Sequence, residues 1–100
     1  MRVANIQLPE AQIAEFCRRH HVRKLALFGS VLRDDFGPES DVDVLVEFEP
    51  GTRVGLRFFT MEEELCRMLG RKVDLNTAGF LSREFRDEVL REAEVQYVAS

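Results

Sequence analysis

The sequence predicts one small α/β (α+β) domain in which helices flank a small mixed β-sheet. Short runs rich in Val and Leu alternate with longer amphipathic runs of helical period, which is typical of helices packed on a sheet. Glycine and proline stand between several of these runs, where turns are expected. The length of 100 residues suits a single domain over residues 1–100, without a second module.

The first part of the chain is expected to form a helix, a strand and a short second helix. Proline and an acid at Leu8–Glu10 favour a helix start there, and that helix ends near His20–His21. Residues 24–28 (KLALF) form the first strand, which Gly29 ends. Ser30 can then cap a short helix.

The rest of the chain is expected to alternate strands with helices. The expected elements are a strand at 41–48, a helix at 55–69 closed by Gly70, a strand at 72–76 and a helix at 81–93. Residues 95–98 either add a short edge strand or dock on the core.

The polarity of the sheet follows from where the polar motifs fall. Gly29-Ser30 lies at the C-terminal end of the first strand, whereas Asp41 and Asp43 lie at the N-terminal end of the second. These ends meet only if the two strands are antiparallel. The third strand follows a helical crossover, so it is expected to run parallel to the second. The sheet is therefore expected to be mixed.

Composition and charge narrow the class of protein. No apolar run approaches the roughly 18 residues of a membrane span, and the N-terminus lacks the pattern of a secretory signal. The net charge of −4 argues against a general polyanion binder, so direct nucleic-acid binding is not expected. Cys17 and Cys66 lack metal-site spacing and are expected to be reduced core thiols. A cytoplasmic protein without membrane contact is the prediction.

Two aspartates at the head of a Val-rich strand need an explanation. Side chains alternate along a strand, so Asp41 and Asp43 share one face and the valines between and after them share the other. The same rule places Asp74 opposite Val73 and Leu75 in the third strand. If the apolar sets face one core, three carboxylates lie on the other side of the sheet.

Such a group of carboxylates is unfavourable without a cation. Two ionised carboxylates about 7 Å apart repel by roughly 2 kcal/mol at an effective dielectric of 20. Mg²⁺ or Mn²⁺ would relieve this, and a pair of such ions is a known arrangement for in-line phosphoryl chemistry. The alternative is that Lys24, Arg33 or Lys72 neutralises the aspartates in plain salt bridges.

Gly29-Ser30 favours the metal interpretation. Glycine lets the backbone N–H groups approach a ligand, serine adds a hydroxyl donor, and the next helix N-terminus favours anions. A phosphate-binding turn would thus face the carboxylates at one end of the sheet. An ordinary strand–turn–helix with a serine cap explains Gly29 and Ser30, but it does not explain the facing acids.

F-G-S, ten residues, and then D-V-D within S-D-V-D-V-L-V resembles the minimal nucleotidyltransferases of the DNA polymerase beta-like superfamily. The resemblance covers about residues 24–76. Within that family, the chain resembles the antitoxin partners of HEPN-type ribonuclease toxins. The resemblance implies the nucleotidyltransferase fold, with Gly29 and Ser30 holding the triphosphate. Many relatives read G-S-x-A-R-G; Arg33 matches that arginine, whereas Asp34 replaces the final glycine.

The resemblance also assigns the acids. It implies that Asp41 and Asp43 bind two magnesium ions, with manganese as an alternative. Asp74 in KVDL matches the third acid, which completes the site and helps to activate the attacking hydroxyl.

The function implied is transfer of AMP from ATP to a hydroxyl, with a tyrosine of a cognate HEPN toxin encoded nearby as acceptor. The small size agrees with an acceptor supplied by another chain. The runner-up is a catalytically silent antitoxin or scaffold that only binds, although a pure binder has no need of three converging acids. A haloacid-dehalogenase-like phosphatase also uses D-x-D, but its aspartates end a strand, whereas Asp41 begins one. The sequence is compatible with either a homo-oligomer or a hetero-oligomer.

Other polar and aromatic residues are interpreted as structural. Glu62-Glu63-Glu64 is expected to be a solvated helix face. Phe58, Phe59 and Met61 are expected to be core or a partner face, and Tyr97 is expected to be packed.

Overall fold

The computed structural model describes residues 8–29, 37, 40–77, 87–88 and 91–99, and the expected helix after Ser30 lies outside them. The elements are α1 (Glu10–Arg19), β1 (Val22–Phe28), β2 (Val42–Phe48), α2 (Arg57–Leu69), β3 (Val73–Thr77) and β4 (Glu94–Val98). Of the helix expected at 81–93, the described residues 87, 88, 91 and 92 are helical. The α+β prediction is confirmed.

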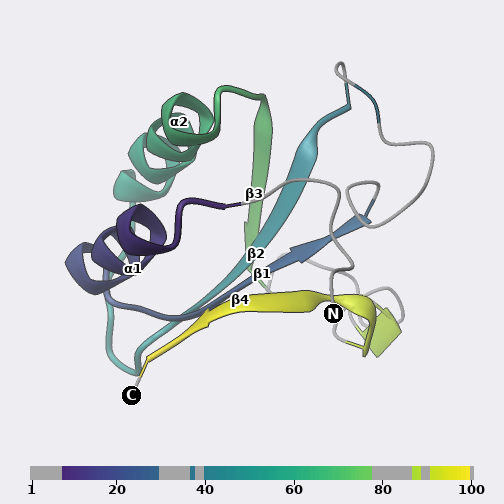
Figure 1. The fold of residues 1–100 in the computed structure, drawn as a ribbon. Coiled ribbons are helices and arrows are strands. Elements are labelled where there is room, and N and C mark those ends of the chain that lie inside the picture. The colour runs from purple at the N-terminus through teal and green to yellow at the C-terminus, as the bar shows by residue number, and fades with distance from the viewer. Residues whose placement is uncertain (1–7, 30–36, 38–39, 78–86, 89–90, 100) are drawn as a thin grey trace.

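The four strands form one mixed sheet in the order β3-β2-β1-β4. β1 runs antiparallel to β2 and to β4, whereas β2 and β3 run parallel. Both predicted strand polarities are therefore confirmed, and the last segment is an edge strand. Figure 1 shows α1 and α2 side by side on the same face of this sheet.

The core lies between that face and the two helices. Val42, Val44 and Val46 of β2 are at most 1% exposed, as their alternation with polar residues predicts. Their partners share full or nearly full burial: Ile13, Phe16 and Cys17 of α1, Met61 and Leu65 of α2, Leu25 and Leu27 of β1, and Val73 and Leu75 of β3. Burying one such side chain is worth roughly 1.5–3 kcal/mol, so this face supplies most of the stability.

Element ends follow local backbone chemistry. α2 ends at Gly70, whose left-handed conformation (φ 65°) lets its N–H donate to the Cys66 carbonyl at 2.9 Å. β1 begins at Val22, two residues earlier than expected. His21 has a positive φ of 59° that turns the chain straight from α1 into the strand, and its carbonyl accepts from Glu49 N at 2.9 Å.

The prediction of a solvated face at residues 62–64 is wrong for Glu62 and Glu64, the outer two of the three acids. A Glu62 carboxylate oxygen accepts from the Leu75 N–H at 2.8 Å, and Cys66 Sγ accepts from the Val73 N–H at 3.3 Å. These two side chains of α2 satisfy donors of β3, which is an edge strand of the sheet. Helical periodicity alone cannot identify an acid that meets a strand edge.

Glu64 links the two helices. Its carboxylate accepts from Arg19, which also donates to Glu15 at 2.8 Å, and it lies 3.0 Å from His20 Nε2. The Arg19 hydrogen bond holds the pKa of Glu64 below its usual value, with a smaller contribution from His20, against the opposing effect of desolvation. The ion pair therefore joins α1 to α2 beside the buried core.

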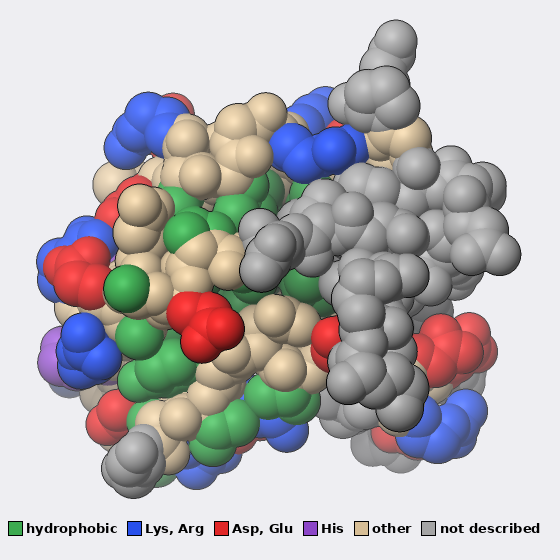
Figure 2. Space-filling view, in the orientation of Figure 1, with side chains coloured by type: hydrophobic (Ala, Val, Ile, Leu, Met, Phe, Trp, Pro, Cys, Tyr) green, Lys and Arg blue, Asp and Glu red, His purple; other side chains and the backbone are tan. Residues whose placement is uncertain are grey.

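The two cysteines were expected to be reduced thiols, and the structure agrees. Both cysteines are free thiols, and burial raises the pKa of Cys17 to about 12, so it stays protonated in the core. Figure 2 shows acidic and basic side chains interspersed over the described part of one face of the molecule. Within the described residues, α1 and α2 are both too short and too polar to cross a membrane.

Candidate active site at one end of the sheet

Asp43 and Asp74 lie side by side on neighbouring strands. In the parallel β2–β3 ladder, Asp43 pairs with Asp74, while Val42 pairs with Val73 and Val44 with Leu75. Because the valine and leucine rows face the helices, both aspartates face the other side of the sheet. Asp43 is half-buried and Asp74 is exposed. The predicted shared face of these two carboxylates is confirmed.

Gly29 touches Asp43 at the point where β1 ends. Phe28 pairs with Asp43 in the antiparallel β1–β2 ladder, which brings the next residue, Gly29, to the carboxylate. Gly29 has a φ of +77°, and a Cβ there would lie 2.1 Å from Asp43 Oδ2. Only glycine fits this position without displacing the acid. The predicted meeting of the glycine turn with the D-x-D segment is therefore observed.

Asp41 stands directly before β2, where neighbouring backbone bonds fix the chain. The Val42 N–H donates to the Lys72 carbonyl at 2.9 Å, which ties the start of β2 to the chain entering β3. Asp41 is half-buried and lies two residues before Asp43, the spacing of side chains on one face of an extended chain.

Not all of the predicted group is gathered. Among the described residues, no three His, Cys, Asp or Glu side chains form a group that could hold a metal ion together. Ser30 and Arg33 lie outside the described residues. Convergence of Asp41, Asp43 and Asp74 on one ion therefore stays a prediction. The carboxylate donors themselves are hard oxygen ligands of the kind that Mg²⁺ and Mn²⁺ take, so they fit such an ion.

One proposed neutralising residue lies too far away. Lys24 pairs with Glu47 near the start of β1, whereas Asp43 pairs with Phe28 at its end. Four residues of strand separate Lys24 from Phe28, or about 13 Å at roughly 3.3 Å per residue. Lys24 is therefore not the counterion of Asp43.

An apolar wall beside the acids was missed from the sequence. Phe28 and Leu45 are 6% and 7% exposed, and Ala93 packs against them on the face opposite the helices. Phe28 is the cross-strand partner of Asp43, and Leu45 follows it on the same face. An apolar surface next to a carboxylate lowers the local dielectric and strengthens the attraction of the carboxylate to a cation. The sequence did contain an indication of this wall, because Leu45 is an apolar residue on the same face of β2 as Asp43.

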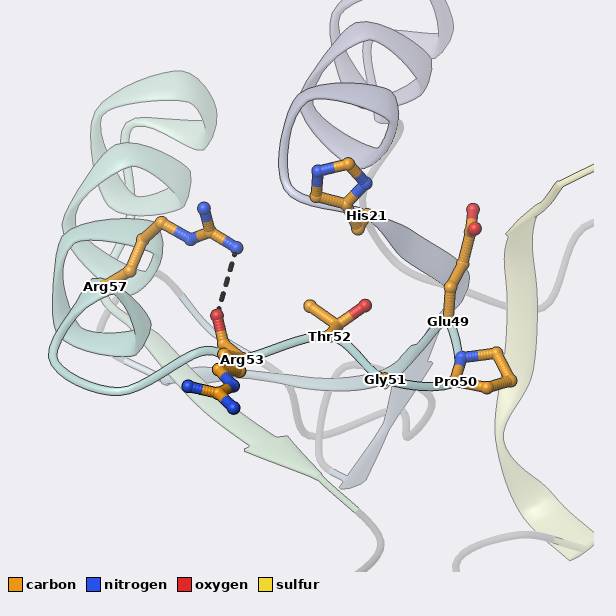
Figure 3. Close-up of a pocket in the computed structure, with 7 residues that line it drawn as sticks. All are labelled: His21, Glu49, Pro50, Gly51, Thr52, Arg53 and Arg57. Carbon is orange, nitrogen blue, oxygen red and sulfur yellow. Dashed lines mark hydrogen bonds between the residues drawn. The ribbon is translucent and has the colours of Figure 1, made fainter.

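A hollow at the other end of the sheet is a separate feature. It measures about 390 Å³ and is lined by His21, Arg57 and the turn at 49–53 (Figure 3). That turn follows the C-terminal end of β2, whereas Asp43 lies near its N-terminal end. The hollow and Asp43 therefore lie at opposite ends of β2.

Residues 10–97 match the sequence model of the nucleotidyltransferase domain, and the chain belongs to this family. The expected family and fold are thereby confirmed, and the chain is a nucleotidyltransferase.

Several individual members of the nucleotidyltransferase family are similar to this chain. Protein adenylyltransferase MntA of Thermococcus cleftensis is 40% identical over 78 residues, which cover 78% of each chain. A solved structure described as a minimal nucleotidyltransferase is 34% identical, with a TM-score of 0.71 over 84% of this chain and 85% of that one. A Shewanella oneidensis tri-AMPylated HEPN toxin in complex with its MNT antitoxin matches at 21% identity, a TM-score of 0.64 and 90% and 70% coverage, which shows a shared fold.

Proposed function

We propose that this nucleotidyltransferase transfers AMP from ATP to a tyrosine hydroxyl of a HEPN-type partner protein encoded nearby, and that the transfer silences the partner. The observation that carries the proposal is the contact of Gly29 with Asp43, because it joins the turn that we expect to bind phosphate to a carboxylate of the D-x-D segment. The Thermococcus cleftensis relative is a protein adenylyltransferase, and the Shewanella oneidensis complex contains an AMPylated HEPN toxin. These names support the acceptor class.

Magnesium is the cofactor that we propose, as two ions held by Asp41, Asp43 and Asp74, with manganese as a substitute. The in-register pairing of Asp43 with Asp74 supports a shared ligand position, because neighbouring strands lie about 4.8 Å apart. Bound divalent ions would offset charge on the triphosphate and on the departing pyrophosphate.

The residues of the chain divide the reaction between them. Gly29, Ser30 and Arg33 hold the triphosphate, so that the α-phosphorus lies against Asp43. The acceptor oxygen forms a bond to the α-phosphorus, the bond from that phosphorus to the bridging oxygen breaks, and pyrophosphate leaves. Asp74 takes the hydroxyl proton as general base.

The exposure of the two paired acids agrees with these roles. Asp43 is half-buried against Gly29 and next to Phe28, where a nucleotide would lie. Asp74 is exposed, so a hydroxyl carried by a second protein can reach it. We therefore propose an acceptor from another chain, a hetero-oligomeric complex and a cytoplasmic reaction.

The test combines purified protein, the product of the neighbouring gene, labelled ATP and Mg²⁺. Intact mass of the partner should rise by one or more AMP units with wild type and with Asp87→Asn, an exposed aspartate outside the strands. Asp74→Asn should retain ATP binding and co-purification yet leave the partner mass unchanged.

Toxin rescue in cells separates the enzyme from a protein that acts by binding only. An antitoxin that only binds would rescue cells equally well with Asp74→Asn, and the partner would carry no added mass. That result would refute the transfer proposal.

A further inference from the structure

Arg71 connects the α2–β3 turn to the loop that leads into the D-x-D segment. Its Nη2 donates to the carbonyl of Gly37 and lies 3.5 Å from that of Ser40. Arg71 is half-buried and follows Gly70, the C-cap of α2. One guanidinium therefore reaches both ends of a turn that is more than 30 residues away in the sequence.

The turn that Arg71 meets has its own internal bonds. The Ser40 N–H donates to the Gly37 carbonyl at 3.0 Å, and the Gly37 N–H donates to Ser40 Oγ at 3.1 Å. The Gly37 carbonyl thus accepts from both Ser40 and Arg71, so hydrogen bonds link Gly37 and Ser40 to each other and to the residue two positions before β3.

Asp41 lies between two fixed points. On its N-terminal side, the Ser40 carbonyl lies against the Arg71 guanidinium. On its C-terminal side, the Val42 N–H donates to the Lys72 carbonyl at 2.9 Å. Arg71 and Lys72 are neighbours that stand directly before β3, and β3 carries Asp74. The same short segment therefore fixes the backbone of Asp41 and carries Asp74.

We infer that Arg71 is a positioning residue that sets Asp41 relative to Asp43 and Asp74, so that the three acids can share their cation. The inference rests on the proposed function for the roles of these acids. In this role Arg71 acts through the backbone carbonyls of Gly37 and Ser40. Both contacts come from Nη2, whose two N–H groups are held in the guanidinium plane, whereas a lysine ammonium on a flexible stem fixes their geometry less well. Residues that orient metal ligands typically contribute about 10–100-fold to metal affinity or activity.

The experiment compares Arg71→Gln and Arg71→Lys with Arg67→Gln, an exposed arginine one helical turn earlier on α2. The first readout is amide hydrogen exchange at residues 40–43. The second is Mn²⁺ affinity in the presence of a non-hydrolysable ATP analogue. Arg71→Gln should accelerate exchange at Ser40 and Val42 and weaken Mn²⁺ binding about tenfold or more, and Arg71→Lys should recover part of both. Arg67→Gln should match wild type.

Kinetics supply the third readout. Arg71→Gln should lower kcat about tenfold or more, while KM for ATP changes less than about threefold, because Gly29 follows β1, and β2 lies between β1 and the β3 strand that Arg71 precedes. Unchanged exchange and unchanged Mn²⁺ affinity in Arg71→Gln would overturn the inference. A fall in both kcat and melting temperature with no change in Mn²⁺ affinity would also overturn it, since that indicates a structural role only.

The two proposals fail in different ways. If wild type adds no AMP to any partner, the proposed function fails. Exchange and Mn²⁺ affinity still decide the role of Arg71, because neither measurement needs an acceptor.

Discussion

The two faces of β2 have opposite tasks, although they alternate residue by residue. Val44 faces the helices and is 1% exposed within the core. Its neighbour Asp43 faces the other way, against Gly29 and beside Asp74. One strand therefore has core side chains on one face and the candidate site residues on the other, and neighbouring residues belong to opposite faces.

The comparison also explains how so short a chain tolerates its acids. Apolar burial on the helix face is roughly 1.5–3 kcal/mol per large side chain, whereas a pair of nearby carboxylates opposes folding by roughly 2 kcal/mol at an effective dielectric of 20. The core face can therefore support an unfavourable charged face. Changes on the two faces should have separable effects on stability and activity.

The largest expected effect is on catalysis, from Asp43→Asn. The substitution keeps the shape of the side chain but removes the negative charge that the proposed cation requires, so transfer should fall at least about 100-fold. The melting temperature should stay within a few degrees of wild type, because Asp43 is not part of the core.

Val44→Ala is the matched change on the opposite face. It should lower the free energy of unfolding by about 2 kcal/mol, through lost burial and a small cavity, while kcat of the folded fraction stays near wild type. Chemical denaturation and the transfer assay measure both quantities. If Asp43→Asn destabilised the protein as much as Val44→Ala, the separation of the two faces would be wrong.

Gly29→Ala should have the next largest effect, again on activity more than on folding. A left-handed φ costs an alanine about 1 kcal/mol, and the new Cβ would displace the Asp43 carboxylate, which is flexible enough to rotate away. Transfer should fall about tenfold or more.

Gly51→Ala is a suitable control for Gly29→Ala. Gly51 has a similar φ of +82°, but a Cβ there would meet only open space in the described structure. Both variants should lose similar stability in thermal melts, and only Gly29→Ala should lose activity. Equal activity in the two variants would contradict the link between the turn and Asp43.

Ser30→Ala should have a smaller effect, limited to nucleotide binding. Loss of one hydrogen bond to a charged phosphate should weaken ATP binding by about 1.5 kcal/mol, or roughly tenfold. Calorimetry with a non-hydrolysable ATP analogue measures it. Unchanged affinity would remove Ser30 from the proposed triphosphate site.

The sequence predicted the strands and their facing well, because alternation along β2 is a local property. Asp43 and Val44 could be assigned to opposite faces without a structure, and the Gly29 turn could be placed at the D-x-D segment by strand polarity. The contact of Arg71 with Gly37 could not, because it joins two turns that are distant in sequence and follows no period. Glu64 was misassigned for a related reason: an amphipathic pattern shows which side of a helix is polar, but not which polar residue meets a neighbouring helix.

The smallest expected effect is on stability, from a change at Glu64, whose side chain links the two helices. Glu64 accepts from Arg19 and lies beside His20, and the Arg19 bond keeps its pKa below the usual value of 4.5. A depressed pKa in the folded state means that this stabilisation is complete above about pH 4.5 and is lost as the pH falls through the folded value. Glu64→Gln should therefore lower stability at pH 7 by about 0.5–1 kcal/mol, allowing for solvent screening.

The pH dependence makes that prediction specific to the ion pair. The difference in melting temperature between wild type and Glu64→Gln, about 3–6 °C at pH 7, should shrink as the pH is lowered below 4.5, because protonation removes the same charge from wild type. Glu63→Gln, a change at the exposed neighbour, should follow wild type throughout. Transfer at pH 7 should be unchanged in both variants, since neither acid lies on the Asp43 face of the sheet. A constant difference across the whole pH range would show that Glu64 stabilises by packing and not by its charge.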